Sequence, residues 1–137
     1  MFFESDYKIL SNEKIAKDVY KMRLEGDTSH ITAPGQFVNI KLDGKFLRRP
    51  ISVCDCEENV ITIIYKVVGE GTEQMSNLKI GKMLNVLTGL GNGYDISKST
   101  KPLLIGGGVG VPPMYFLAKK LIKSGQRPCV VLGFNTK

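Results

Sequence analysis

The sequence has 137 residues, of which 19 are Lys or Arg and 13 are Asp or Glu, so its formal net charge is +6. Hydrophobic residues at 42% and charged residues at 23% are proportions typical of a globular chain, and they exclude an intrinsically disordered one. The lysines are spread along the chain, without arginines clustered among aromatic residues, which argues against a nucleic-acid partner.

From Tyr7 to about Ile96 the hydrophobic residues recur with a period of two, which is typical of strands with one buried face. Turn-forming residues, such as Ala33-Pro34-Gly35 and Asp43-Gly44, separate the runs. Short strands joined by tight turns favour a small antiparallel barrel, and we predict one over residues 1–98. The residues expected to share its buried face are Tyr20, Met22, Leu24, Val38, Ile40, Leu42, Ile61, Ile63, Tyr65 and Val67.

A short helix is expected within the barrel sequence. Thr72 is followed by six residues without a strand pattern, ending at Leu78. Threonine is a favoured residue at the N-terminal cap of a helix. We therefore predict a helix of one or two turns that is capped by Thr72 and ends near Gly81.

Beyond a polar linker at 97–101 the pattern changes from strands alone to strand, helix and strand. Leu103 to Ile105 is a short apolar run, and Met114 to Lys123 has the spacing of an amphipathic helix with Gly125 placed to end it. Cys129 to Leu132 is the second expected strand. The expected fold class is therefore a β barrel plus α/β, with a parallel βαβ unit over residues 99–137. Two parallel strands would leave this sheet open, so we expect this nucleotide-binding domain to be truncated.

A glycine-rich loop joins the first of these strands to the helix. Its Gly-x-Gly-x-x-Pro spacing is close to the fingerprint of dinucleotide-binding proteins, in which glycines let a phosphate approach the backbone at a helix N-terminus. A tight strand–helix turn is the alternative, and the flanking strand and helix favour nucleotide binding. The candidate residues are Gly106, Gly107, Gly108, Gly110 and Pro113.

Two further motifs are ambiguous when each is taken alone. Arg48 and Arg49 precede Pro50-Ile51-Ser52 at the start of a strand, where they could bind an anion or form a solvated edge. Ile64-Tyr65-Lys66 leads to Gly71 and Thr72, which could offer backbone N–H groups and a hydroxyl to a phosphate.

In this order, and with Leu90-Gly91-Asn92-Gly93-Tyr94 between them, the motifs resemble those of the ferredoxin–NADP reductase superfamily. They are most similar to those of the electron-transfer subunits of type B dihydroorotate dehydrogenases, and the resemblance spans about 7–137. It implies that the barrel binds FAD and that the second domain binds NAD. Thr88-Gly89 stands where the family more often has Gly-Pro, and Ile51 stands where much of the superfamily has a Tyr.

The resemblance also implies a role for each motif residue. Arg49, with Pro50 and Ile51 beside it, would bind the FAD pyrophosphate, and Ser52 would be the catalytic residue near the flavin N5. Ile64, Tyr65 and Lys66 would flank the flavin and its ribityl chain, and Gly71 and Thr72 would hold phosphate. Gly106, Gly107, Gly108, Gly110 and Pro113 would hold the nicotinamide nucleotide, with the choice of NAD or NADP left open.

The implied function is an oxidoreductase subunit that passes electrons between NAD(H) and FAD. They would continue through a [2Fe–2S] centre, whose ligands lie outside this chain, to an FMN-containing dihydroorotate dehydrogenase subunit in pyrimidine biosynthesis. We expect the 137 residues alone not to be fully active. One alternative is an electron-transfer subunit of another ferredoxin–NADP reductase, sulfide dehydrogenase or sulfite reductase complex. A second is a non-enzymatic nucleotide-binding module.

The remaining side chains that could carry chemistry are few. Three cysteines and one histidine, without a Cys-x-x-Cys pair, favour a reducing, cytoplasmic setting and no metal site. The uncharged stretch 102–118 holds four Gly and three Pro, and two acids lie near Met1, so we expect neither a membrane helix nor an export signal. We expect Cys54 and Cys56 to be structural residues on the same strand face as Ser52. His30 is expected to be solvated, as are Lys119, Lys120 and Lys123. Tyr115 and Phe116 are expected to pack in the core.

Overall fold

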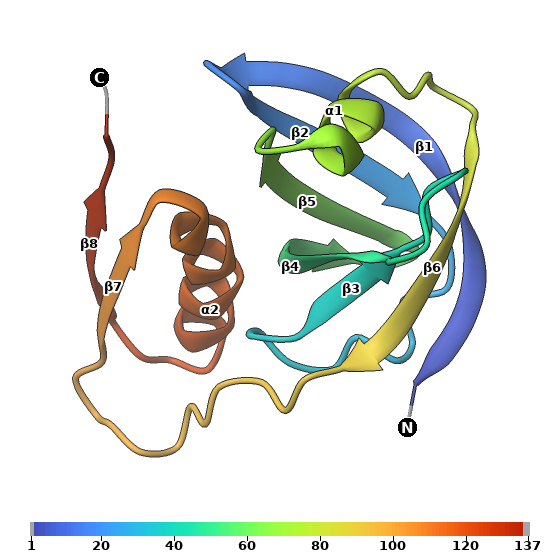
Figure 1. Ribbon diagram of the computed structural model, residues 1–137. Helices are drawn as coiled ribbons and strands as arrows, with labels where there is room; N and C mark the ends of the chain where they lie inside the picture. Colours follow the sequence, from blue (N-terminus) through green and yellow to red (C-terminus); the bar gives the residue numbers. More distant parts are fainter. Residues whose placement is uncertain (1, 136–137) are drawn as a thin grey trace.

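The first six strands close into an antiparallel barrel, which confirms the predicted architecture (Figure 1). The computed structural model describes residues 2–135. Around the barrel the strands are ordered β1-β2-β5-β4-β3-β6, and every neighbouring pair is antiparallel. Their bounds are β1 (Phe3–Ala16), β2 (Val19–Glu25), β3 (Phe37–Ile40), β4 (Arg49–Glu57), β5 (Val60–Lys66) and β6 (Met83–Leu90).

The barrel interior holds the main hydrophobic core. The period-two pattern correctly predicted its inward faces, because alternate side chains of a strand point to opposite sides of the sheet. Burying each large apolar side chain stabilises the fold by about 1.5–3 kcal/mol. Among the predicted positions, Met22, Leu24, Val38, Ile40, Leu42, Ile61, Ile63 and Tyr65 are all buried, while Tyr20 and Val67 are partly buried.

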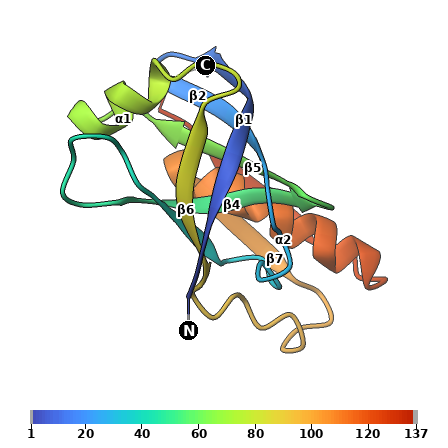
Figure 2. The same ribbon diagram turned by 90° about the vertical axis from the view of Figure 1, so that its right-hand side faces the viewer.

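Helix α1 (Glu70–Ser76) lies across the end of the barrel that is remote from the N-terminus (Figures 1 and 2). It is capped by Gly69, so the prediction that Thr72 caps it is wrong. Thr72 lies in the first turn, and its hydroxyl accepts hydrogen bonds from the N–H groups of Val68 (2.9 Å) and Gly69 (3.2 Å). The helix ends at Ser76 rather than near Gly81, because the chain leaves it through the Asn77 cap.

The α/β unit follows the barrel with the predicted order of elements. It consists of β7 (Leu103–Gly107), a 3-10 turn at Gly108–Gly110, α2 (Val111–Lys123) and β8 (Cys129–Gly133). β7 and β8 pair in parallel, and α2 lies between this sheet and the barrel (Figure 1). α2 begins three residues before the predicted start, because prolines are well accommodated in the first turn of a helix. Its Met114, Leu117 and Leu121 pack with Leu104 in a second, smaller core.

An irregularity in β4 changes which of its side chains face the core. Val53 pairs with Ile63 but Asp55 pairs with Thr62, so Cys54 is an extra residue, as in a β-bulge. Beyond the bulge the alternation is reversed, and Cys56 packs against the barrel core while Cys54 lies outside it. Cys54 therefore shares the outer face of Ser52 as expected, but the expectation is wrong for Cys56.

Buried titratable groups make the fold sensitive to high pH. Burial, and then the charge of Asp27, raises the pKa of Tyr7 from 10.0 to about 12, and burial also raises the pKa of Tyr65. Between the unfolded and folded pKa values only the folded state keeps the proton, so the free energy of unfolding falls as pH rises. We expect Tyr7 alone to lower the free energy of unfolding by about 2 kcal/mol between pH 10 and 12.

Urea unfolding measured at several pH values from 8 to 12 tests this expectation. Tyr7→Phe removes one titrating group, so its stability should fall less steeply with pH than that of the unchanged protein. An identical slope in the two proteins would contradict the role of Tyr7.

Candidate functional site

Two sequence motifs meet at the N-terminal end of α1. Arg49 begins β4, and its guanidinium lies directly over Gly71, such that a Cβ atom on Gly71 would lie 2.6 Å from Arg49 Cζ. The same guanidinium donates a hydrogen bond from Nη1 to the carbonyl of Leu47 (2.6 Å). A cation beside backbone that carries no Cβ atom is an arrangement suited to a phosphate group. We call Arg49 and Gly71 the phosphate cradle.

Contacts behind the cradle hold its helix in place. The loop between β3 and β4 projects beside α1 (Figure 2), and Lys45 in this loop forms an ion pair with Glu70 (2.9 Å). This contact holds the pKa of Glu70 below its ordinary value. The Tyr65 hydroxyl donates to Asn12 Oδ1 (2.7 Å), and Asn12 Nδ2 donates to the carbonyl of Met75 in α1 (2.9 Å). Both contacts fix α1 relative to the strands.

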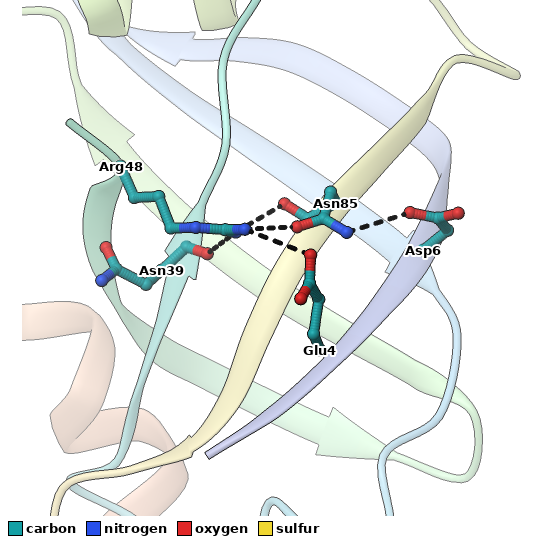
Figure 3. Close-up of polar contacts among 5 residues, drawn as sticks. All are labelled: Glu4, Asp6, Asn39, Arg48 and Asn85. Atoms are coloured by element: carbon teal, nitrogen blue, oxygen red, sulfur yellow. Dashed lines mark hydrogen bonds and ion pairs between the residues drawn. The ribbon is translucent and has the colours of Figure 1, made fainter. Parts of the chain in front are cut away.

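The Arg48 side chain makes different contacts from that of its neighbour Arg49. Figure 3 shows its guanidinium reaching across the barrel wall to Asn39 and Asn85. It donates to the carbonyls of Asn39 (3.2 Å) and Asn85 (3.3 Å) and to Asn85 Oδ1 (2.5 Å), and it approaches Glu4 Oε1 at 3.5 Å. Asn85 in turn donates to Asp6 (3.3 Å). Arg48 therefore ties β3, β6 and β1 together, and this side chain is neither a solvated edge nor part of the cradle.

A cleft separates the barrel from the glycine loop and α2. Its volume of about 630 Å³ is in the range of small-molecule and cofactor sites. Its wall is mostly apolar, and Lys17 and Lys66 supply positive charge. The lining residues are Ile15, Ala16, Lys17, Val19, Cys54, Ile64, Tyr65 and Lys66 from the barrel, and Gly108, Val109, Val111, Pro112, Tyr115, Phe134 and Asn135 from the second unit.

The predicted barrel residues are not all equally exposed to this cleft. Tyr65 borders the cleft but is only 2% exposed, because its ring packs in the barrel core, whereas Ile64 and Lys66 alternate outward. Ser52 is partly buried and pairs with Phe37. Ile51 packs against the core, and Pro50 is exposed.

The glycines of the loop are needed for different structural reasons. A Cβ atom on Gly106 would lie 2.9 Å from Met114 Cγ and 3.0 Å from the Gly110 carbonyl oxygen, so strand–helix packing requires a glycine there. Gly108 has a φ of +55°, which side chains disfavour. Gly107 and Gly110 have neither constraint, since a Cβ atom on either would meet no atom within 4 Å. Pro113 is buried in the first turn of α2. Open space beside the N-terminus of a thirteen-residue helix is suited to a bound anion.

The free thiols in the described residues are Cys54, Cys56 and Cys129. Burial, and then the neighbouring Asp55 charge, raises the pKa of the Cys54 thiol to about 11. Burial raises the pKa of Cys56 as well. Cys54 lines the cleft, and its raised pKa disfavours the reactive thiolate form there.

Several expectations for isolated side chains need correction. Tyr115 is 57% exposed in the cleft and does not pack in the core, whereas Phe116 does pack against the barrel core. The Lys119 ammonium is not simply solvated, because it contacts Asp55. His30 stacks on Phe3, with ring centroids 3.4 Å apart. The sequence does contain a signal for the helix face that meets the barrel and the cleft. Val111, Tyr115 and Lys119 are spaced four residues apart, so their side chains lie on one face of the helix.

Neither a metal cluster nor a membrane-spanning helix is found within residues 2–135. No group of three or more His, Cys, Asp or Glu side chains is placed to hold a metal ion there. No helix in this range is long and apolar enough to cross a membrane.

Comparison with known proteins supplies a family context. No family model matches the chain. It is 48% identical to the dihydroorotate dehydrogenase B (NAD(+)) electron transfer subunit of Fusobacterium nucleatum subsp. nucleatum, over 96% of this chain and 54% of that protein. It is 40% identical to the subunit of the same name from Bacillus cereus (strain G9842), over 94% of this chain and 53% of that protein. The chain therefore spans about half the length of these relatives.

A solved structure with a similar fold is that of an NADH-dependent reduced ferredoxin–NADP oxidoreductase, described for flavin-based electron bifurcation. It superposes with a TM-score of 0.88 and 37% identity, over 96% of this chain and 49% of that one. The resemblance that the motifs indicated, and the expected combination of barrel and α/β unit, are confirmed by these matches.

Proposed function

Because this chain is a homologue of dihydroorotate dehydrogenase B electron transfer subunits and has a ferredoxin-reductase fold, we propose that it carries FAD and passes electrons between FAD and NAD(H). The observation that carries the proposal is the convergence of Arg49 on Gly71, two residues from separate motifs that form one phosphate cradle. In this proposal residues 1–98 are the FAD-binding domain, and residues 99–137 begin the NAD-binding domain.

The residues of the barrel fit an FAD group. Arg49 would bind its pyrophosphate through charge-assisted hydrogen bonds, and Gly71 leaves the backbone open to it. Thr72 keeps its hydroxyl on the Gly69 turn and orders the backbone that faces the phosphate. Ile64 and Lys66 would flank the ring and the ribityl chain, with Tyr65 contributing its backbone. Ser52 would donate a hydrogen bond near N5, with Pro50 and Ile51 shaping the strand beside it. When bound, FAD supplies the conversion between two-electron and one-electron transfer.

The glycine loop fits the nicotinamide dinucleotide. Gly107 and Gly110 leave open space before α2, and Gly108 provides the turn. Pro112 and Pro113 have no N–H, so the first turn of α2 would attract phosphate through the N–H groups of Val111 and Met114 and through the helix dipole. Gly106 and Pro113 hold the strand and the helix in contact behind the loop.

Beyond this chain, we propose that electrons continue through a [2Fe–2S] centre whose ligands lie outside it. The recipient, or donor, would be an FMN-containing dihydroorotate dehydrogenase subunit of pyrimidine biosynthesis. The names of the relatives support this choice, since they describe an electron transfer subunit of that enzyme. A second candidate is a subunit of another ferredoxin–NADP reductase, favoured by the 37% identity to the bifurcating oxidoreductase.

The test is to purify the full-length protein with its natural partners and measure bound flavin and its reduction by NADH. We expect about one FAD for each chain, a yellow protein, and loss of the colour when NADH is added. Coupled oxidation of dihydroorotate would support the dihydroorotate dehydrogenase assignment, and its absence in a flavin-loaded complex would favour the second candidate. A colourless protein that takes up no FAD would refute the proposal.

A further inference from the structure

One ion pair joins the barrel to α2 beside the cleft. Lys119 Nζ lies 2.9 Å from Asp55 Oδ1 and 3.1 Å from Oδ2, so the ammonium is shared by both carboxylate oxygens. The Asp55 side chain is only 11% exposed, whereas that of Lys119 is 47% exposed. Asp55 Oδ1 also accepts a hydrogen bond from the Cys56 N–H (2.9 Å), which fixes the carboxylate in place. The contact raises the pKa of Lys119, so the ammonium stays charged.

The bulge in β4 puts Asp55 in position for this contact. Val53 faces the core, and in a regular strand without the bulge Asp55, two residues later, would also point inward. A carboxylate in the apolar barrel would be strongly unfavourable. The bulge instead places Asp55 on the outer wall against α2, while Cys54 lies on the wall of the cleft.

Lys119 lies on the same stripe of α2 as the cleft-lining residues. Val111 and Tyr115 line the cleft, and Lys119 follows Tyr115 by four residues, which is the spacing of neighbours on one helix face. A helix moves as a rigid element, so a displacement of α2 from β4 at Lys119 also shifts Tyr115 and Val111. The ion pair is therefore placed to control how far α2 lies from the opposite wall.

We propose that Asp55 and Lys119 are positioning residues that set the width of the cleft between the barrel and α2. The effect of these two residues on electron transfer rests on the proposed function, in which the two walls of the cleft hold FAD and NAD. Loss of the Lys119 ammonium leaves a buried carboxylate without its counterion, and separation of α2 from β4 would let water reach it. Phe116 still packs against the barrel core, so α2 stays attached and the protein stays folded.

The experiment compares three variants in the full-length protein with its partners. Lys119→Met keeps the length of the side chain and removes its charge, Lys119→Arg keeps the charge, and Lys123→Met removes an exposed charge near the end of the same helix. FAD content, the rate of flavin reduction at saturating NADH, and amide hydrogen exchange in β4 and α2 are measured for each.

We expect Lys119→Met to slow flavin reduction at least about tenfold, since a misplacement of about 1 Å can cost about a hundredfold. FAD content should be unchanged, exchange should increase in α2, and Lys119→Arg should restore most of the rate. Lys123→Met should behave like the unchanged protein. Equal rates and equal exchange in Lys119→Met and Lys123→Met would overturn the proposal. If the unchanged protein binds no FAD, the proposed function fails, and hydrogen exchange alone still decides whether the ion pair holds α2.

Discussion

Replacing Arg49 by alanine is expected to weaken FAD binding about tenfold to a hundredfold, with little change in the free energy of unfolding. The guanidinium lies over Gly71 and donates a hydrogen bond to the carbonyl of Leu47, two residues away, so its loss removes little internal support. A charge-assisted contact to a phosphate contributes about 1.5–3 kcal/mol, which corresponds to the expected loss of affinity. Titration of the apoprotein with FAD, followed by flavin fluorescence at constant salt, measures it.

Arg48→Ala is the matched control for this experiment. Its guanidinium is bound to Asn39 and Asn85 across neighbouring strands, so we expect the free energy of unfolding to fall by about 2 kcal/mol. The FAD affinity of the protein that remains folded should be unchanged. The assignment of the cradle would be wrong if Arg49→Ala bound FAD normally, or if the two variants lost affinity equally.

These two arginines illustrate how far sequence reasoning reaches in this protein. The repeat of apolar residues every second position predicted the barrel, because one rule of alternation governs all of its strands. The same rule says that adjacent residues point to opposite sides, but it does not say which of Arg48 and Arg49 faces α1. That choice depends on where Gly71 and Asn85 come to lie after the strands pair.

The bulge in β4 is a second feature that the sequence alone does not predict. Local sequence around Cys54 has no Gly or Pro that marks an irregularity, so strict alternation was the only available expectation. The pairing with Thr62 and Ile63 then reverses the alternation, and it explains both the outward Asp55 and the inward Cys56. The helical spacing places Lys119 on the same face as Val111 and Tyr115, but it does not reveal Asp55 as the partner of Lys119, because Asp55 comes from another part of the chain.

Gly110→Val is expected to weaken NADH binding at least about tenfold while FAD stays bound. Nothing in the described chain lies within 4 Å of a Cβ atom on Gly110, and its φ of −82° is ordinary for any residue. The free energy of unfolding should therefore change by less than about 0.5 kcal/mol, as for other substitutions without a new clash. A branched side chain at the start of α2 would fill the space that a phosphate needs. NADH titration of the FAD-loaded protein measures the effect.

Gly106→Val is the control that distinguishes weakened NADH binding from unfolding of the α/β unit. Its side chain would meet Met114 and the backbone of Gly110, so β7 and α2 could not stay in contact, at a cost of about 1–3 kcal/mol or more. We expect the α/β unit to lose protection from hydrogen exchange in this variant, with NADH binding lost as a consequence, while the barrel retains FAD. If Gly110→Val also loses protection, its effect is structural. If it keeps both protection and NADH affinity, no dinucleotide approaches the loop at that position, and the glycine there has no role in binding.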